Sequence, residues 1–347
     1  MAFAYRLAGL CRAVGTDHGL VQVLQRDLRA LGYLWRGIDG EFGLLTQAAV
    51  RALQYDLLHN DGRSTGKDGD APVAVKSFSQ GVRDVTGIVD PALADSIEAL
   101  LGEDRVPKLP SSRDAATANR DAFAEIFRAA GRRVPMPFLL AMFQQESGCR
   151  HYAVPKPPGD ADSYVIIGLD RDSKDADHIL SRGYGIGQYT ISHHPPRPEE
   201  VSGFIADPLR NIEQAVDVFV DKFEKWVRGA AGARDYRAEH PALNALRLCR
   251  YAPSDPSYMS ACRDCAATAG KHDLGPDSPL YKGTRQTYGE VHHHRPTTYR
   301  GVPDRADFQC DWPYAMRRYN GCGPDSFNYQ AIILGSLLAP PPSGPEG

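Results

Sequence analysis

Apolar residues recur at three- and four-residue steps in three stretches of the first 101 residues, which predicts three helices. The first helix runs from residue 20 to residue 31 and ends at Gly32, a residue suited to the turn that closes a helix. The second has Thr46 near its start. The third begins at Asp90, which caps the helix, and the following proline takes the first turn. The predicted buried faces are Val21, Leu24, Leu28 and Leu31; Ala49, Val50, Leu53 and Leu57; and Leu93, Ile97, Leu100 and Leu101.

Polar stretches divide the chain. Residues 60–70 form an insert rich in glycine and aspartate, which we expect to be a mobile surface loop; the alternative is that it lengthens one wall of a binding groove. Residues 102–115, with two prolines and two serines, are predicted to be a linker. The chain therefore divides into an N-terminal domain at residues 1–101 and a larger domain at residues 116–338, followed by a disordered tail at 339–347.

The larger domain is also predicted to consist mainly of helices. One carries Phe123, Ile126 and Phe127 toward a core. The next starts at the prolines of residues 135–137 and ends at Gly148. Three more are expected, and residues 255–311 are expected to be irregular. The starting points of these three helices are Pro208, Ala242 and Asp325, and the last one buries Tyr329, Ile332, Ile333 and Leu337.

The helix that ends at Gly148 carries the first candidate for chemistry. Leu139, Met142, Phe143 and Glu146 share one of its faces because they recur at three- and four-residue steps. Burial on an apolar face and the negative end of the helix should both raise the pKa of Glu146, and a general acid needs such a pKa near neutral pH. The alternative from the helix alone is that Glu146 lies at the edge of the face and is solvated.

Alternating glycines at residues 183, 185 and 187 predict an extended or turning backbone that a ligand can approach closely. The sequence here resembles the lytic transglycosylase and goose-type lysozyme superfamily. The matching motifs are Glu146-Ser147, the run from Gly185 to Thr190 (Gly-Ile-Gly-Gln-Tyr-Thr) and, far along the chain, Tyr319-Asn320-Gly321. The resemblance covers residues 116–338 and implies a lysozyme-like, mainly α (α+β) catalytic domain.

The resemblance also implies roles for these residues. Glu146 would act alone as acid and base, first giving a proton to the glycosidic oxygen and then taking one from the C6 hydroxyl, which leaves a 1,6-anhydromuramoyl product. Substrate contacts are implied for Ser147, Gln188, Tyr189 and Thr190. Tyr319 would orient Glu146 or the substrate, and Asn320 would support the turn of its motif. Two alternatives remain: a hydrolytic muramidase that uses an aspartate of residues 155–177 as the second carboxylate, and a non-catalytic wall-binding protein.

The N-terminal domain resembles the small three-helix peptidoglycan-binding domain. The motif residues are Leu24-Gln25, Leu31-Gly32-Tyr33, Asp39-Gly40-Glu41-Phe42-Gly43, Thr46, Ala49-Val50 and Gln54. We interpret Asp39, Gly40 and Phe42 as turn and core residues, and expect wall contacts from exposed groups such as Tyr33, Trp35 and Arg36. The expected fold class is therefore mainly α, with this domain preceding the lysozyme-like domain in the sequence.

Composition limits the partners. The 347 residues carry a formal net charge of −3 with scattered basic residues, which gives no case for nucleic acid, and no stretch approaches a membrane span. Six of the seven cysteines follow residue 148, which suits disulfides formed after export, and Cys11 is the expected free thiol. We expect no metal and no cofactor, because the Cys262/Cys265 pair and the histidines at 292–294 lack standard ligand spacing.

The expected partner is bacterial peptidoglycan, with a possible immunity or delivery protein. The first ten residues lack a basic start and a long apolar core, so we expect no signal peptide. Action in the periplasm or cell wall would then require delivery by phage lysis, as for an endolysin, or by a dedicated secretion system, as for an antibacterial effector.

Overall fold

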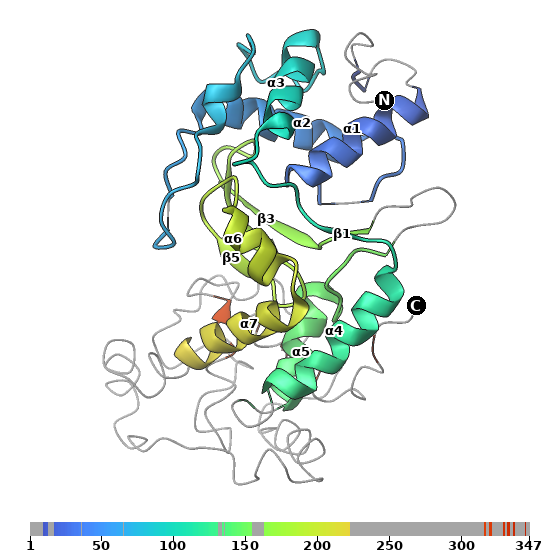
Figure 1. The fold of residues 1–347 in the computed structure, drawn as a ribbon, viewed down its shortest axis with the longest axis vertical. Helices are drawn as coiled ribbons and strands as arrows, with labels where there is room; N and C mark the ends of the chain where they lie inside the picture. The colour runs from blue at the N-terminus through green and yellow to red at the C-terminus, as the bar shows by residue number, and fades with distance from the viewer. Residues whose placement is uncertain are drawn as a thin grey trace, which may run out of the picture. The chain divides into compact units, whose positions relative to one another are not determined.

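The structure is a computed structural model that describes residues 10–12, 17–35, 37–64, 66–130, 134, 136–154 and 163–222, and the single residues 316, 319, 320, 329, 332, 333, 336 and 344. Seven α-helices and five short strands lie in these ranges, so the mainly α class is confirmed (Figure 1). The predicted helix at 242–248, the irregular region at 255–311 and the tail, apart from Gly344, lie outside the described residues.

The chain forms two compact units. Residues 1–122, 150–211 and 347 make the first, and residues 123–149 and 212–346 make the second. The predicted domains, 1–101 and 116–338, follow from sequence alone and stay predictions.

The three predicted N-terminal helices are confirmed in the first unit. They are α1 (His18–Ala30), α2 (Leu44–His59) and α3 (Pro91–Gly102), and a short 3-10 helix, Val75–Phe78, lies between the last two. Asp17 caps α1 by accepting hydrogen bonds from two backbone N–H groups. Asp90 caps α3 in the same way, at 2.8 Å from the N–H of Leu93, with proline in the first turn. Gly32 follows α1 with a φ of +79°, which only glycine adopts freely.

Burial of one face of each helix holds this part of the first unit together. Val21, Leu24, Leu28, Val50, Leu53, Leu93 and Ile97 are fully buried in one cluster. Every other predicted face residue is buried too, except Leu101, which is partly buried. Each such side chain contributes about 1.5–3 kcal/mol through the apolar surface that it removes from water.

Three strands form a small antiparallel sheet in the same unit. β3 (Ile167–Arg171), β4 (Ile179–Tyr184) and β5 (Tyr189–Ile191) are neighbours in that order. Part of the stretch at 155–177, whose aspartates are the alternative second carboxylate, is thus a strand, and Asp170 in β3 is exposed. Ile179 of β4 joins the core of the N-terminal helices, while Tyr184 belongs to a second core with Val165 and Ile205.

The segment predicted to be a linker is hydrogen bonded along its length. The N–H of Leu109 donates to the carbonyl of Ala30 at the end of α1, at 2.8 Å. β1 (Ser111–Ser112) then pairs with β2 (Ser163–Tyr164). Since an extended strand pair and a buried Leu109 fix its path, this segment is an ordered part of the first unit.

Two buried arginines connect the N-terminal helices to the sheet region. Arg29 of α1 donates to the carbonyl of Val165, at 3.1 Å, and lies over the ring of Tyr164. Arg182 of β4 donates to the carbonyl of Gly32, at 3.1 Å, and pairs with Asp56 of α2, at 3.4 Å. Buried charges need such partners, because an unpaired one costs several kcal/mol, on the order of 3–5.

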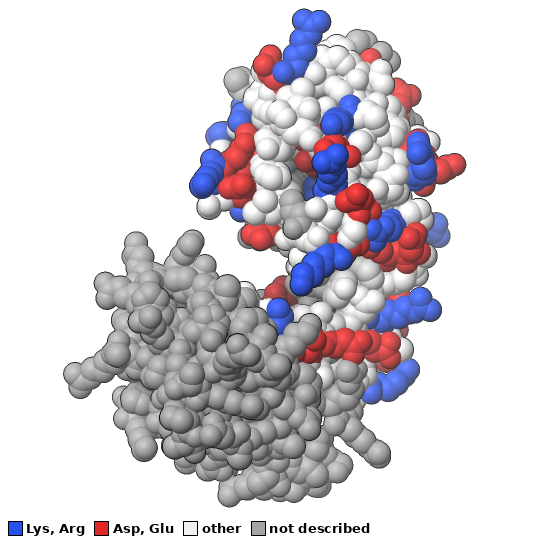
Figure 2. Space-filling view, turned by 90° about the vertical axis from the view of Figure 1, so that its left-hand side faces the viewer, with Lys and Arg blue, Asp and Glu red and all other residues white. Residues whose placement is uncertain are grey.

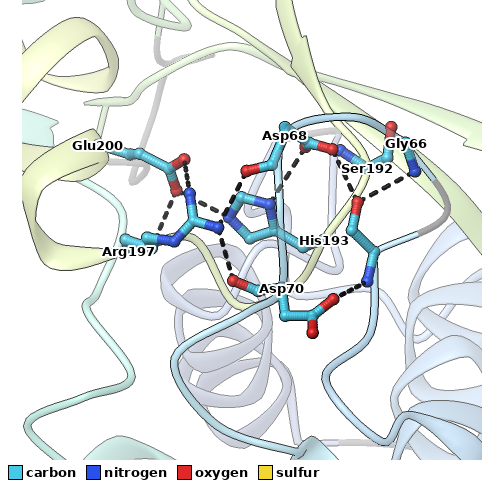
Figure 3. Close-up of polar contacts among 8 residues, drawn as sticks. Gly66, Asp68, Asp70, Ser192, His193, Arg197 and Glu200 are labelled. Carbon is cyan, nitrogen blue, oxygen red and sulfur yellow. Dashed lines mark hydrogen bonds and ion pairs between the residues drawn. The ribbon is translucent and has the colours of Figure 1, made fainter.

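The described residues of the insert at 60–70 form no helix or strand, as expected of a loop, and Asp68 and Asp70 are hydrogen bonded to residues 192–197. The Asp68 carboxylate accepts from the N–H of Ser192, and the Arg197 guanidinium donates to the carbonyl oxygens of Asp68 and Asp70 (Figure 3). Periodicity could not reveal these contacts, because both partners lie in polar segments more than 120 residues apart.

The second unit contains the rest of α4 (Ala115–Ala130), α5 (Met136–Ser147) and most of α7 (Pro208–Lys222). In α5, residues 137–143 are all buried, so this part of the helix is covered on every side, while Gln144 and Gln145 in its last turn are exposed. In α4, Ile126 is buried but Phe127 is 47% exposed, which makes its predicted core position wrong. Neighbouring helix residues point about 100° apart, and Phe127 instead contacts Phe123 edge to face at 5.5 Å.

Candidate active site

Glu146 is the second-last residue of α5 and is half-buried. The chain leaves the helix directly after it, because Gly148 and Cys149 both have positive φ values, of 65° and 56°. Their N–H groups donate to the carbonyls of Gln144 and Phe143, which closes the last turn. Glu146 is therefore presented at the end of a rigid, buried helix.

Tyr329 holds the Glu146 carboxylate. Its hydroxyl donates to Glu146 Oε1 at 2.7 Å. Burial raises the pKa of Glu146 above its ordinary value, and the hydrogen bond from Tyr329 lowers it by less. The net rise matches the expectation from sequence. A carboxyl group with a raised pKa keeps its proton to higher pH, as a general acid must.

The ring of Tyr319 lies beside the ring of Tyr329 in the same unit. The two rings stack at 6.5 Å and 30°, and Phe219 of α7 meets Tyr319 edge to face at 6.0 Å. Burial raises the pKa of both tyrosines, and the nearby Glu146 carboxylate raises it further, so both phenols stay protonated. Tyr329 can then only donate to the carboxylate.

Sequence reasoning gave the orienting role to Tyr319 and placed Tyr329 in a helix core. The structure shows Tyr329 bonded to Glu146 and 6% exposed. One signal could have found it: a tyrosine on an otherwise aliphatic buried face, with Ile332 and Ile333, needs a partner for its hydroxyl. The assignment of Tyr319 to substrate contact stays a prediction.

Two further predicted residues lie near these groups in sequence. The Ser147 hydroxyl donates to the carbonyl of Phe143 at 3.1 Å, one turn back along α5. Asn320 is exposed. The roles of Ser147 and Asn320 toward the substrate stay predictions.

The predicted glycine-rich turn connects β4 to β5 in the first unit. Gly185 has a φ of +71° and Gln188 a φ of +49°. The Gln188 side chain folds back and donates from Nε2 to the carbonyl of Gly185 at 2.8 Å. Glycines at 168 and 183 leave the room that this side chain occupies, since a Cβ atom at Gly183 would lie 3.1 Å from Gln188 Oε1.

Buried side chains satisfy the backbone of this turn. The N–H of Ile186 donates to His151 Nδ1 at 3.3 Å, and the N–H of Gly187 donates to Asn211 Oδ1 at 2.8 Å. A Cβ atom at Gly185 would lie 2.5 Å from the His151 ring, so only glycine fits there. Sequence reasoning identified the glycines but neither His151 nor Asn211.

The two residues after Gln188 begin β5. Tyr189 is half-buried and meets Phe204 edge to face at 4.7 Å. Thr190 is exposed, and its hydroxyl donates to the carbonyl of Gln188 at 3.0 Å. The structure thus brings Gln188, Tyr189 and Thr190 together on the first unit, while Glu146 and Tyr319 belong to the second.

One predicted wall contact is wrong. Tyr33 is 1% exposed, and its hydroxyl donates to Asp56 at 2.8 Å, so it is a core residue and no exposed contact. An aromatic residue directly after a helix-ending glycine can turn in or out, and here the ring is covered by Arg182 at 5.1 Å. Trp35 is 41% exposed and stays a candidate, and Arg36 lies outside the described residues.

A second polar cluster, here called the polar clasp, consists of Asp68, His193, Arg197 and Glu200 (Figure 3). The buried His193 ring lies between Asp68 Oδ2, at 3.1 Å, and Glu200 Oε2, at 2.9 Å, and Arg197 Nη1 donates to Glu200. Hydrogen bonds and nearby positive charge outweigh burial and lower the pKa of both carboxyl groups. The nearby Ser64 hydroxyl donates to Asp68 and not to the imidazole, so the cluster is no nucleophile-activating triad.

The described ranges contain neither a cluster of three or more metal-ligating side chains nor a helix apolar and long enough to span a membrane. Their surface carries both charges: on the face in Figure 2, basic and acidic side chains are interspersed.

Comparison with known families gives one match. Residues 17–62 match the family described as "Putative peptidoglycan binding domain". A search of curated proteins and a search of solved structures gave no match. The family match covers α1 and α2 and supports the resemblance found in the N-terminal sequence, and with it an association with the cell wall.

Proposed function

We propose that this chain is a peptidoglycan-degrading lytic transglycosylase. It would cleave the β-1,4 bond between N-acetylmuramic acid and N-acetylglucosamine and leave 1,6-anhydromuramic products. The observation that carries the proposal is Glu146, a half-buried carboxyl group with a raised pKa at the end of a buried helix, held by the Tyr329 hydroxyl at 2.7 Å. The family match at residues 17–62 supports the choice of substrate.

In the first step, protonated Glu146 gives its proton to the glycosidic oxygen, and the bond from that oxygen to C1 of the muramoyl residue breaks. Since Tyr329 donates to Oε1, the proton that Glu146 transfers is carried by Oε2. In the second step, the Glu146 carboxylate takes the proton of the C6 hydroxyl, whose oxygen attacks C1. The acid is restored and no water is consumed.

The other assigned residues would bind the glycan. We propose that Ser147, Gln188, Tyr189, Thr190 and Tyr319 contact the sugars, with Asn320 supporting the turn of its motif. The wall-binding helices would raise the local concentration of enzyme on an insoluble substrate. Trp35 and Arg36 are the proposed wall contacts. Action in the periplasm or cell wall, delivery by phage lysis or a secretion system, and an immunity or delivery partner belong to the same proposal.

Mass spectrometry of the soluble products released from purified sacculi tests the reaction. We expect wild-type protein to release muropeptides that end in anhydromuramic acid, and Glu146→Gln to lower the rate at least about 10²-fold, the usual contribution of a general acid. Glu98→Gln, an exposed change in α3, is the matched control and should leave the rate unchanged.

Three outcomes contradict the proposal. Products with a free reducing end would make the enzyme a muramidase, and the aspartates at 155–177 would then be tested as the second carboxylate. Equal rates for wild type and Glu146→Gln would remove Glu146 from the chemistry. Binding to sacculi without any product would leave a wall-binding protein.

A further inference from the structure

Two buried polar side chains, His151 and Asn211, take no part in the steps above. Both are fully buried, at 0% exposure. Such groups cost folding free energy unless they are hydrogen bonded, so their partners show what they are used for. In both cases the partners are backbone groups of the turn from Tyr184 to Gln188 and of residues 204–205.

The contacts of His151 define one tautomer. Its Nδ1 faces the N–H of Ile186 at 3.3 Å and must accept, while its Nε2 lies 2.9 Å from the carbonyl of Ile205 and must donate. Burial lowers the pKa of His151 to about 4, although the Ile205 carbonyl and the charge of Asp207 act the other way. The ring is therefore neutral near pH 7. A proton on Nδ1 would face the N–H of Ile186 and break that bond.

Asn211 uses both ends of its amide. Oδ1 accepts from the N–H of Gly187 at 2.8 Å, and Nδ2 donates to the carbonyls of Tyr184, at 2.8 Å, and Phe204, at 3.1 Å. One side chain thus joins both ends of the turn to the segment before α7. Its position is fixed because it lies in the first turn of that helix.

A third buried polar side chain, the amide of Asn119, fixes His151 itself. Asn119 of α4 accepts from the N–H groups of His151 and Tyr152, at 2.9 and 2.8 Å, and donates to the carbonyl of Tyr152 at 2.8 Å. The Tyr152 ring meets the imidazole edge to face at 4.8 Å. The imidazole therefore has little freedom to move away from the turn.

We propose that His151 and Asn211 are positioning residues that fix the turn from Tyr184 to Gln188, so that Gln188, Tyr189 and Thr190 are held ready for the glycan. The inference rests on the proposed function, which gives those three residues their substrate contacts. Because the turn is held before the glycan arrives, binding does not have to order it. Loss of a turn contact should therefore weaken glycan binding more than it slows the chemistry at Glu146.

Two substitutions of His151 separate positioning from mere folding. Asn carries an oxygen near the place of Nδ1, so His151→Asn keeps an acceptor for Ile186. Gln carries a nitrogen near the place of Nε2, so His151→Gln keeps a donor for Ile205 and removes the Nδ1 acceptor that the N–H of Ile186 uses. The same two changes at the exposed His59 are the controls.

The steady-state constants KM and kcat are measured on soluble, uncross-linked glycan strands, together with thermal unfolding. We expect His151→Gln to raise KM about tenfold, the effect of losing one buried hydrogen bond, and to change kcat by less than about twofold. His151→Asn should raise KM by less than about threefold. Amide hydrogen exchange at Ile186 should be faster in His151→Gln than in His151→Asn.

An active wild type whose KM is unchanged in His151→Gln overturns the inference alone. Equal KM changes in both variants that follow their loss of Tm also overturn it, because they show a folding role only. A wild type without Glu146-dependent product overturns the proposed function and, with it, this inference. If His151→Gln does not fold, Asn211→Ser removes the acceptor of Gly187 from the same turn, and an unchanged KM there is equally decisive against positioning.

Discussion

The turn from Tyr184 to Gln188 and the end of α5 at Glu146 are built in opposite ways. In the turn, His151, Asn211 and Gln188 bond to four of the backbone groups of residues 184–187. At Glu146, the described residues supply one hydrogen-bond donor to the carboxylate, the Tyr329 hydroxyl. The first arrangement uses three side chains to satisfy the backbone, whereas in the second the described residues give the half-buried carboxyl group a single donor.

The difference follows from what each region is proposed to do. A backbone that presents side chains to a glycan gains from rigidity, since an ordered site loses less entropy on binding. A general acid gains from poor solvation, since additional donors would stabilise its anion and lower its pKa. The stability of the turn should therefore be sensitive to added side-chain volume. The pKa of Glu146 should be sensitive to the number of hydrogen-bond donors around its carboxyl group.

Gly185→Ala should disrupt the turn and give the largest effect of the substitutions, a loss of stability. We expect a loss of about 3 kcal/mol in the free energy of unfolding, from the left-handed φ of +71° and from a Cβ atom 2.5 Å from His151 Cε1. Gly148→Ala, two residues after the candidate acid, is the matched control: its φ is +65°, but apart from its own chain neighbours no atom of the described residues lies within 4 Å of the added Cβ. It should cost only about 1 kcal/mol.

Urea unfolding of both glycine variants gives the measurement. Equal losses would mean that crowding around the turn adds nothing to the backbone cost, which would contradict the tight arrangement described for Gly185.

Tyr329→Phe removes the one described hydrogen-bond donor to Glu146. Its effect, a loss of activity, should be smaller than the loss of stability in Gly185→Ala. We expect kcat to fall about tenfold, because the carboxyl group loses its fixed position. The pKa of Glu146 should rise, because the lost hydrogen bond lowers it in the wild type. The alkaline limb of the pH profile of kcat/KM, where the acid loses its proton, should move to higher pH.

Tyr55→Phe, which removes a half-buried hydroxyl from α2, is the control for Tyr329→Phe. An alkaline limb that stays in place or moves to lower pH would show that Tyr329 does not tune Glu146.

Glu146→Gln should have the smallest effect on stability and the opposite sign. A carboxyl group whose pKa is higher in the folded state than in the unfolded state binds its proton more tightly when folded, so it loses stability as pH rises through these two pKa values. The neutral amide lacks this loss. We expect Tm to rise on the order of 2 °C at pH 7 and the difference to vanish at acid pH, below the ordinary carboxyl pKa.

Thermal unfolding of Glu146→Gln at pH 7 and pH 3 measures this effect. A variant less stable than wild type at pH 7 would mean that the carboxylate is stabilised by the fold.

Local signals predicted much of the structure. The spacing of Leu24, Leu28 and Leu53 indicated helix faces that are buried, and Asp90 with its proline marked the start of α3. These features depend on residues a few positions apart, so the sequence carries them directly. The raised pKa of Glu146 was predicted in the same way, from its place on a helix.

Contacts between distant segments were not predictable. Tyr329 lies 183 residues from Glu146, and the role of Tyr33 depended on Asp56 and Arg182, which periodicity does not connect to it. The segment at 102–115 had the composition of a linker, but its β-pairing with Ser163 and Tyr164 requires a partner about 50 residues away. Composition and periodicity describe a segment by itself, whereas the roles of Tyr329, Tyr33 and the segment at 102–115 depend on residues distant in sequence that they contact.

The polar clasp and the buried Arg182–Asp56 pair have a consequence for how this chain can change over generations. A wall-binding domain on a free linker can be exchanged between genes by recombination, because the cut separates no buried charges. Here an exchange of the N-terminal helices would deprive Arg182 of Asp56 and His193 of Asp68. We therefore expect descendants of this chain to inherit both halves of the first unit together, with residues 68 and 193 substituted as a pair.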